Sequence, residues 1–165
     1  MDEQRSVGAD LHIRQYEPAD TDRVWAVHEA ALRASGLAFV EDAPQDADIR
    51  DIEAEYLDGR GTFLVGETDG EIAAMGGLQF VTEQTTEIRR MRVHPDYQRQ
   101  GFGRQVLSAL EATAREHGAR TVALSTHEDL VAAQAFYQAA GYEHSHSKPN
   151  PVTGDALLHY EKRLE

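Results

Sequence analysis

The spacing of apolar residues along the chain predicts an alternation of strands and helices. Short alternating or continuous apolar runs are typical of strands, whereas apolar residues three or four apart are typical of one buried helix face. Strands are predicted over residues 11–16, 62–67, 72–81, 87–93, 121–126 and 157–164. Helices are predicted after the turn at 18–21, around 49–59, from the glycines at 101–103 to Gly118, and over 130–140. The stretch SHSKPNPVTGD, residues 145–155, predicts a loop.

The order of these elements indicates the fold class. Asp69-Gly70 lies between two predicted strands and is a strong signal for a β-hairpin. Hairpins come first along the chain, and strand–helix–strand units follow. This order predicts an α/β protein of the α+β type, in which helices cover both faces of a central mixed sheet.

Length and composition indicate one domain. With 165 residues, 41% of them hydrophobic, the chain can bury one core. We expect residues 1–10 to be a flexible N-terminal prefix and residues 11–165 to form a single domain. No apolar run is long enough to cross a bilayer, and the acidic N-terminus is unlike a signal peptide, so we expect a cytoplasmic protein. The absence of cysteine excludes disulfides, thiolate metal sites and a cysteine nucleophile.

The chain is strongly acidic, with a net charge of −13, and Lys148 and Lys162 are its only lysines. Nucleic acid is therefore not an expected partner. The densest basic cluster, Arg89, Arg90 and Arg92, lies on a predicted strand, where side chains alternate between faces. An acidic, lysine-poor surface is similar to that of proteins from high-salt cytoplasm, where carboxylates keep a protein hydrated and salt screens their repulsion.

The most informative motif is Gln-Arg-Gln-Gly-Phe-Gly at residues 98–103, which opens directly into a predicted helix. Glycines allow a ligand to approach the backbone, and the first helical turn offers unpaired N–H donors that suit a diphosphate. From the spacing alone, a tight turn without a ligand is an equal alternative. The motif is neither a P-loop nor a dinucleotide-binding fingerprint.

This motif resembles the Gln/Arg-x-x-Gly-x-Gly/Ala signature of the GNAT superfamily of N-acetyltransferases. Upstream, GEIAAMGGLQF and TEIRRMRVHP resemble the third and fourth strands of that fold, and downstream AAQAFYQAAGY resembles its tyrosine-bearing helix and the next strand. From about Leu11 to the end, the chain follows the family's order. The resemblance implies a GNAT-type acyl-CoA N-acyltransferase fold, with about six or seven strands and about four helices.

The resemblance also implies acetyl-CoA as co-substrate. Its acetyl group would pass directly to a primary amine in a ternary complex, because the chain has no cysteine to carry it. The backbone of residues 99–104 would bind the pyrophosphate, with the side chains of Gln98 and Arg104 as further donors. The backbone N–H of Met91 would face the acetyl oxygen, and Val93 would pair with the pantetheine arm. The implied coenzyme-binding residues are Met91, Arg92, Val93, Gln98, Arg99, Gln100, Gly101, Phe102, Gly103, Arg104 and Tyr137.

Each of these assignments has a plainer alternative. Arg99 and Arg104 can equally be surface arginines, and the side chains of Met91 and Val93 are ordinary core residues. The family's pattern also fails at one place. Seven residues before Tyr137, where many members carry a coenzyme-binding asparagine, this chain has Leu130.

Glu87 and Tyr137 are the candidate catalytic side chains. Glu87 lies fourteen residues before Gly101, where several members of the superfamily have a base, and would accept a proton from the amine. The alternative is a carboxylate that is solvated or paired with Arg89. Tyr137 would protonate the leaving thiolate, since a phenol stays protonated at neutral pH. Its alternative is a tyrosine packed at the edge of an apolar helix face.

The acceptor is the least determined part of the site. Acidic residues crowd positions 41–55 and suit a cationic amine, but a solvated acidic face explains them as well. A small molecule, a peptide N-terminus and a lysine all fit. His127 could line the acceptor pocket, whereas His144 and His146 are expected to be surface or loop histidines rather than metal ligands. No metal and no membrane partner are expected, and a homodimer is expected only by analogy.

Two other kinds of function stay open. A non-catalytic acyl-CoA-binding or sensing module would keep the glycine loop and use Glu87 and Tyr137 only for structure. A different phosphate-binding protein would bind nucleotides without a pantetheine arm as well as it binds coenzyme A.

Overall fold

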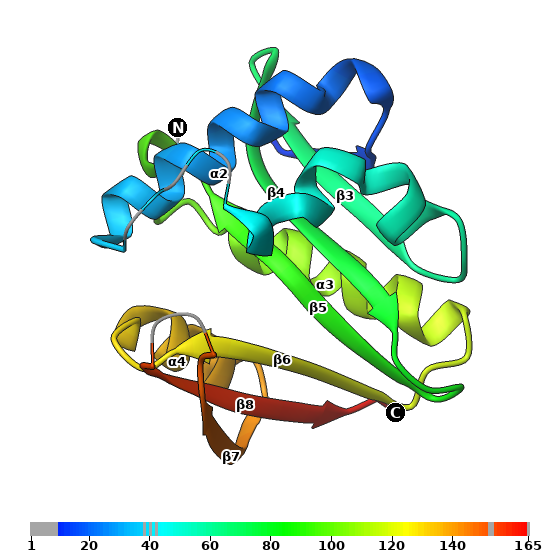
Figure 1. The fold of residues 1–165 in the computed structure, drawn as a ribbon. Coiled ribbons are helices and arrows are strands. Elements are labelled where there is room, and N and C mark those ends of the chain that lie inside the picture. The colour runs from blue at the N-terminus through cyan, green and yellow to red at the C-terminus, as the bar shows by residue number, and fades with distance from the viewer. Residues whose placement is uncertain (1–9, 38, 40, 42, 152–153, 165) are drawn as a thin grey trace, which may run out of the picture.

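The computed structural model describes residues 10–37, 39, 41, 43–151 and 154–164. The predicted N-terminal prefix therefore lies almost wholly outside the described residues. Seven strands form one sheet in the order β2-β3-β4-β5-β6-β8-β7 (Figure 1). The neighbouring strands are antiparallel except β5 and β6, which are parallel. The strands are β2 (His12–Gln15), β3 (Thr62–Thr68), β4 (Glu71–Phe80), β5 (Thr85–Val93), β6 (Thr121–His127), β7 (Glu143–Pro149) and β8 (Ala156–Arg163).

The predicted hairpin is confirmed between β3 and β4. Asp69 and Gly70 have φ values of 54° and 79°, and Thr68 pairs with Glu71 across the turn. Positive φ at both central residues is the geometry that matches the right-handed twist of the two strands, and Asp-Gly adopts it at low cost.

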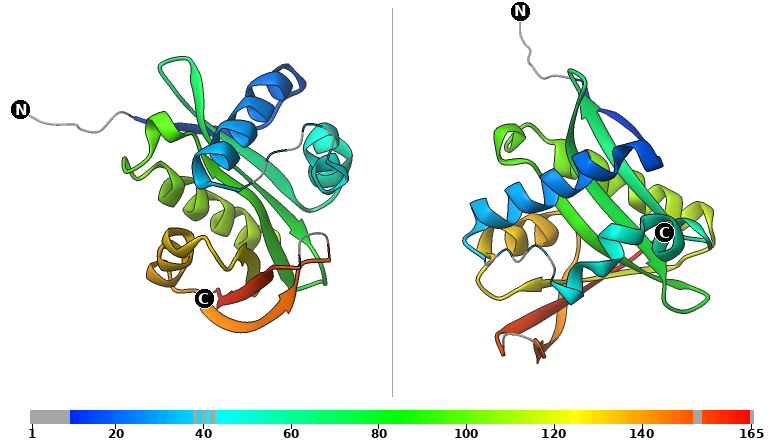
Figure 2. Two further views of the ribbon diagram at one scale, coloured as in Figure 1. Left: turned by 60° about the vertical axis from the view of Figure 1, so that its left-hand side comes forward. Right: turned by 45° about the horizontal axis from the view of Figure 1, so that its top comes forward.

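Helices cover both faces of the sheet (Figure 2), as the element order predicts. One face carries α2 (Thr21–Ser35), η2 (Pro44–Asp51) and η3 (Glu53–Leu57), while α3 (Phe102–Glu116) and α4 (Val131–Ala139) cover the other. Single turns η1 (Pro18–Asp20) and η4 (Pro95–Tyr97) precede α2 and α3. The core consists of two clusters, one on each face. None of the helices within the described residues is both long and apolar enough to cross a membrane.

Two sequence predictions are wrong in part. The predicted loop at 145–155 begins with a strand, because β7 pairs with β8 from Glu143 to Pro149. The strand β7 is exposed along its whole length and carries no apolar alternation, so its pairing depends on backbone hydrogen bonds that leave no trace in the pattern. The helix predicted around 49–59 is a 3-10 segment, η2, followed by a π-helical turn, η3. The prediction assumes that one apolar stripe of an α-helix is buried in this segment. The segment also buries Asp46 and Asp48, which are not part of that stripe.

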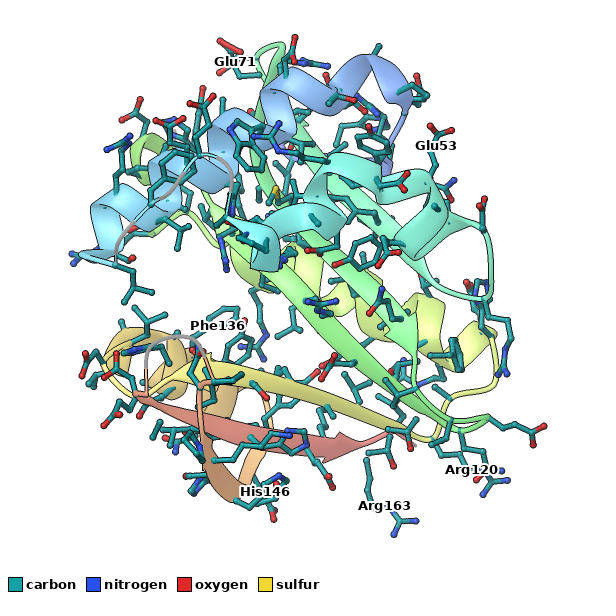
Figure 3. The ribbon with its side chains drawn as sticks, viewed as in Figure 1. Glu53, Glu71, Arg120, Phe136, His146 and Arg163 are labelled. Atoms are coloured by element: carbon teal, nitrogen blue, oxygen red, sulfur yellow. The ribbon has the colours of Figure 1, made fainter. Side chains whose placement is uncertain are left out.

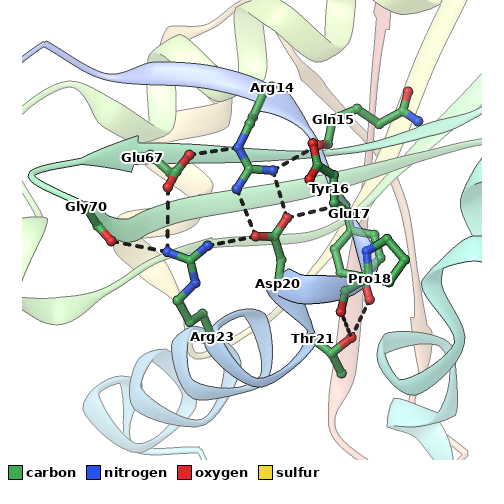
Figure 4. Close-up of polar contacts among 10 residues, drawn as sticks. All are labelled: Arg14, Gln15, Tyr16, Glu17, Pro18, Asp20, Thr21, Arg23, Glu67 and Gly70. Carbon is green, nitrogen blue, oxygen red and sulfur yellow. Dashed lines mark hydrogen bonds and ion pairs between the residues drawn. The ribbon is translucent and has the colours of Figure 1, made fainter.

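A buried carboxylate joins β2 to the start of α2 (Figure 4). Asp20 is 1% exposed and accepts hydrogen bonds from the guanidinium groups of Arg14, at 2.7 and 2.8 Å, and Arg23, at 2.8 Å. It also accepts one from the N–H of Glu17 at 2.8 Å. The hydrogen bonds from Arg14 outweigh the effect of burial and lower the pKa of Asp20 to about 2.

Candidate active site

The strands β5 and β6 separate part of the way along their length. They are paired only where residues Thr85, Thr86 and Glu87 face Thr121, Val122 and Ala123. Beyond Glu87, β5 runs on to Val93 and β6 to His127 without a register between them (Figure 1). The sheet is therefore open beside the last two thirds of β5, and this is the place where a ligand can lie against its backbone.

A β-bulge on β5 sits at this opening. Arg90 has φ +61°, and neither Arg90 nor Met91 has a partner in the register with β4, which shifts between Met75 and Gly77. A side chain at Gly76 would meet the sulfur of Met91, so Met91 points toward α3. A bulge of this kind takes backbone groups out of the ladder and re-aims side chains.

The bulge corrects the expectation that the three arginines of β5 alternate between faces. Arg90 forms ion pairs with Asp46 and Asp48 of η2. Arg89 donates a hydrogen bond to Gln79, and the amide of Gln79 donates to the carbonyl of Glu55 in η3. Because the bulge inserts an extra residue, Arg89 and Arg90 both face η2 and η3.

The loop before α3 has the backbone of an anion-binding turn. Arg99 and Gly101 both have positive φ, 67° and 80°, and Gly101 is the N-cap of α3. The first helical hydrogen bond runs from the N–H of Gln105 to the carbonyl of Gly101, at 3.1 Å. The N–H groups of residues 102–104, in the first turn, therefore have no acceptor within the helix. Successive free N–H groups at a helix N-terminus favour an anion.

A cavity of about 620 Å³ runs from this loop to the open side of β5. Of the predicted coenzyme residues, all except Gln100 line it. It is lined by Met91, Arg92, Val93, Tyr97, Gln98, Arg99, Gly101, Phe102, Gly103, Arg104, Ala132, Ala133, Phe136 and Tyr137. The sequence interpretation missed Tyr97 and the α4 residues Ala132, Ala133 and Phe136. Helical spacing marks an apolar face but does not distinguish a face that lines a cavity from one that fills a core. Phe136 lies on the α4 side of the opening (Figure 3).

Tyr137 lines the cavity and is only 8% exposed. Its ring packs edge-on against Phe136 and Tyr142, at centroid distances of 5.2 and 5.9 Å. Burial raises the pKa of Tyr137 to about 12, and the positive charge of Arg92 opposes that rise. The phenol is therefore protonated at neutral pH and able to donate.

Glu87 does not line the cavity. It forms the last pair of β5 with β6, opposite Ala123, where the two strands begin to separate. Its carboxylate is 33% exposed and lies 4.0 Å from Nε of Arg89, the limit of an ion pair. The side chain thus lies where β5 and β6 begin to separate. From this position it can either accept a proton from the amine or pair with Arg89.

The histidines are largely committed to structure. His127 has both ring nitrogens engaged, Nδ1 accepting from the N–H of Asp129 and Nε2 bonded to the Asp155 carboxylate, each at 3.0 Å. On β7, His146 stacks on His159 at 4.5 Å between ring centroids, and His144 is bonded to the hydroxyl of Ser147. Within the described residues, no group of three or more histidine, aspartate or glutamate side chains has the arrangement of a metal site.

Part of the acidic segment at 41–55 is turned inward. Asp46 and Asp48 are 5% and 7% exposed, and Tyr56 donates a hydrogen bond to Asp48. Buried His28 lies 3.1 Å from Asp46, and burial lowers the pKa of its imidazole below the ordinary value, so it is neutral at pH 7. Glu41, Asp51, Glu53 and Glu55 are exposed, while Asp42 lies outside the described residues. Asp46 and Asp48 fit neither interpretation of this segment, because they are buried and form ion pairs with Arg90.

A family model described as the acetyltransferase (GNAT) family matches residues 23–142. The chain belongs to this family. The [ribosomal protein bS18]-alanine N-acetyltransferase of Escherichia coli is 33% identical over 95 residues, which cover 54% of this chain and 64% of that protein. The chain spans less than two thirds of the length of the first curated relatives that it matches.

Solved structures of this family share the fold. A GNAT acetyltransferase from Staphylococcus aureus superposes with a TM-score of 0.83 at 19% identity, covering 94% of this chain and all of that one. The PaiA N-acetyltransferase of Thermoplasma acidophilum, solved in complex with coenzyme A, has a TM-score of 0.76 at 16% identity, with 94% and 99% covered. The predicted GNAT-type fold is therefore confirmed.

Proposed function

We propose that the protein is an acetyl-CoA-dependent N-acetyltransferase that moves the acetyl group directly from the thioester to a primary amine within a ternary complex. One observation carries this proposal: a single cavity joins the anion-binding loop at 99–104 to the open side of β5, where Met91 leaves the ladder and Tyr137 is buried. Family membership and the relative solved with coenzyme A support it.

The residues that line the cavity fit acetyl-CoA along its length. The N–H groups at the start of α3, with Gln98 and Arg104 beside them, would hold the pyrophosphate. Val93 and the unpaired edge of β5 would bind the pantetheine arm as if it were an added strand. Gln98 already donates to the carbonyl of Val93 at 3.4 Å, which joins the two parts of this surface.

The chemistry would be divided among three groups of the chain. The N–H of Met91, outside the β4 register, would stabilise negative charge on the acetyl oxygen. Tyr137 would donate its proton to the departing sulfur, and Glu87, directly or through water, would accept a proton from the attacking amine. When bound, acetyl-CoA supplies an activated acyl group, so no covalent intermediate on the protein is needed.

An assay of acetyl-CoA consumption over amines of differing charge tests the proposal. We expect turnover with at least one amine class, and we would measure it at low and at multimolar salt because of the net charge of −13. The relative that is named for acetylating a ribosomal protein's alanine makes a peptide with a free N-terminus one member of the panel. We also propose a cytoplasmic location.

The non-catalytic acyl-CoA-binding module keeps one observation in its favour, the position of Glu87 outside the cavity and near Arg89. Such a module would bind acetyl-CoA in calorimetry and consume none of it with any amine. Turnover that requires both acetyl-CoA and an amine would exclude it.

A further inference from the structure

Within the described residues, one arginine beside the open side of β5 forms no ion pair with an acidic side chain. Nε of Arg92 is buried and has no hydrogen-bond partner. Within the part of the chain that the structure describes, its guanidinium donates only to the carbonyl of Met91, the preceding residue, at 3.1 Å. Burial, reinforced by the positive charge of Arg90, holds the pKa of Arg92 below its usual value. A cation in such surroundings is costly unless an anion joins it.

Two buried carboxylates lie near Arg92, but within the described residues no hydrogen bond or ion pair joins either of them to its guanidinium. Arg90 binds one oxygen of Asp46 at 3.1 Å, and the other lies 3.1 Å from His28. Arg90 also binds both oxygens of Asp48, at 2.6 and 3.0 Å. Among the described residues, these acids are thus bonded to Arg90 and not to Arg92.

Arg92 lines the same cavity as Tyr137. Its charge also acts on both the Tyr137 phenol and the His28 imidazole, which belong to α4 and α2. The guanidinium therefore lies within electrostatic reach of both helices, and among the described residues no hydrogen bond or ion pair joins it to the loop at 99–104. In the proposed function the phosphates of the coenzyme occupy that loop, and the arm between phosphates and thioester is uncharged. An anion for Arg92 must therefore come from one of the reacting groups.

We propose that Arg92 binds a carboxylate carried by the acceptor, so that the amine substrate is a molecule of the amino-acid type rather than a polycation. This inference rests on the proposed function. A guanidinium presents parallel N–H donors that match the two oxygens of a carboxylate, which would fix the position of an amine on the same molecule. The exposed acids at 41–55 would then face solvent.

The experiment compares matched acceptors, an α-amino acid and the amine that remains when its carboxyl group is removed, such as phenylalanine and 2-phenylethylamine, together with spermidine. We expect the unaltered protein to prefer amino acids by about tenfold or more in kcat/KM. In Arg92→Met this preference should fall to about one through a higher KM for the amino acid. Arg92→Lys keeps the positive charge but not the parallel N–H donors of the guanidinium. It should give an intermediate preference for the amino acid over the amine. Arg163→Met removes an exposed arginine at the far end of the sheet and should change nothing (Figure 3).

Other outcomes would overturn the inference. A preference of the unaltered protein for 2-phenylethylamine or spermidine contradicts it without any variant. So does an amino-acid preference that Arg92→Met leaves intact. A second arm replaces acetyl-CoA by succinyl-CoA with 2-phenylethylamine as acceptor; if Arg92→Met changes only the choice between these acyl donors, the carboxylate belongs to the acyl group. Turnover of amines without a carboxylate preference rejects this inference alone, whereas no turnover of any amine rejects the proposed function as well.

Discussion

Arg90 holds both carboxylate oxygens of Asp48, with Nε at 3.0 Å and a terminal nitrogen at 2.6 Å. The pair joins the bulge of β5 to η2, and both side chains are nearly buried, at 12% and 6% exposed. Burial pushes the pKa of Asp48 upward, but the hydrogen bonds from Arg90 and Tyr56 outweigh it and the pKa lies below its ordinary value. The Arg90–Asp48 pair thus fixes the bulge of β5 against η2.

Breaking this pair should destabilise the fold. Asp48→Asn removes the carboxylate that binds Arg90 through both oxygens and leaves the buried guanidinium with Asp46 alone, so a loss of about 3 kcal/mol in the free energy of unfolding is expected. Urea unfolding followed by circular dichroism measures it. Arg33→Ala, which breaks the exposed pair of Arg33 with Glu29, should cost less than about 0.5 kcal/mol. Equal losses in the two variants would show that burial does not set the value of the Arg90–Asp48 pair.

Asp20 should make stability depend on pH in the acid range. Its pKa in the folded chain is about 2, below the value of 3.8 for an unperturbed aspartate, so the folded state favours the ionised form. This contribution, about 2 kcal/mol, is present above pH 3.8 and is lost as the pH falls toward 2. Asp20→Asn should therefore be less stable than the unaltered protein at pH 7, and this difference should shrink near pH 2. Asp22→Asn, at an exposed position two residues away, should show no such pH-dependent difference.

The sequence predicts most of the sheet and the place of the coenzyme site, for identifiable reasons. The Asp69-Gly70 turn and the glycine loop before α3 carry local signals that do not depend on distant contacts. Strand β7 has no such local signal, because backbone pairing with β8 holds it. The 3-10 conformation of η2 has none either, because it depends on the burial of Asp46 and Asp48. The positive φ of Arg90 could not be predicted from the sequence either, because a bulge is often signalled by a glycine and this position is an arginine.

The backbone of the glycine loop should be essential for coenzyme binding. Gly101 has φ +80°, and a Cβ at Gly103 would lie 3.2 Å from Val93 and 3.6 Å from the ring of Phe136. Gly101→Asp or Gly103→Asp should abolish acetyl-CoA binding in titration calorimetry, through added bulk and charge repulsion. Gly70→Asp is the matched control, with φ +79° and open space around it, but outside the residues that line the cavity. Normal binding by either loop variant would contradict the assignment of the pyrophosphate to this turn.

Glu87 should matter for turnover and not for coenzyme affinity. If its carboxylate drains the proton from the amine, Glu87→Gln should lower kcat/KM for the amine by about 10²-fold or more, with the calorimetric Kd for acetyl-CoA unchanged. Glu143→Gln, on the exposed edge strand β7, should leave both values unchanged. Full activity in Glu87→Gln would instead assign this side chain to its contact with Arg89, 4.0 Å away.

Tyr137 should act in the chemical step through its hydroxyl alone. Tyr137→Phe keeps the ring packed against Phe136 and Tyr142, so the fold and acetyl-CoA binding should persist while kcat falls by about 10²-fold. Because the pKa of Tyr137 is about 12, loss of its proton should not limit the unaltered protein below about pH 11. Stopped-flow or steady-state rates across this range measure both effects. The control is Tyr160→Phe, a buried tyrosine of β8 that does not line the cavity. A Tyr137→Phe protein with unchanged kcat would remove the phenol from the mechanism and leave the sulfur to depart as an unprotonated thiolate.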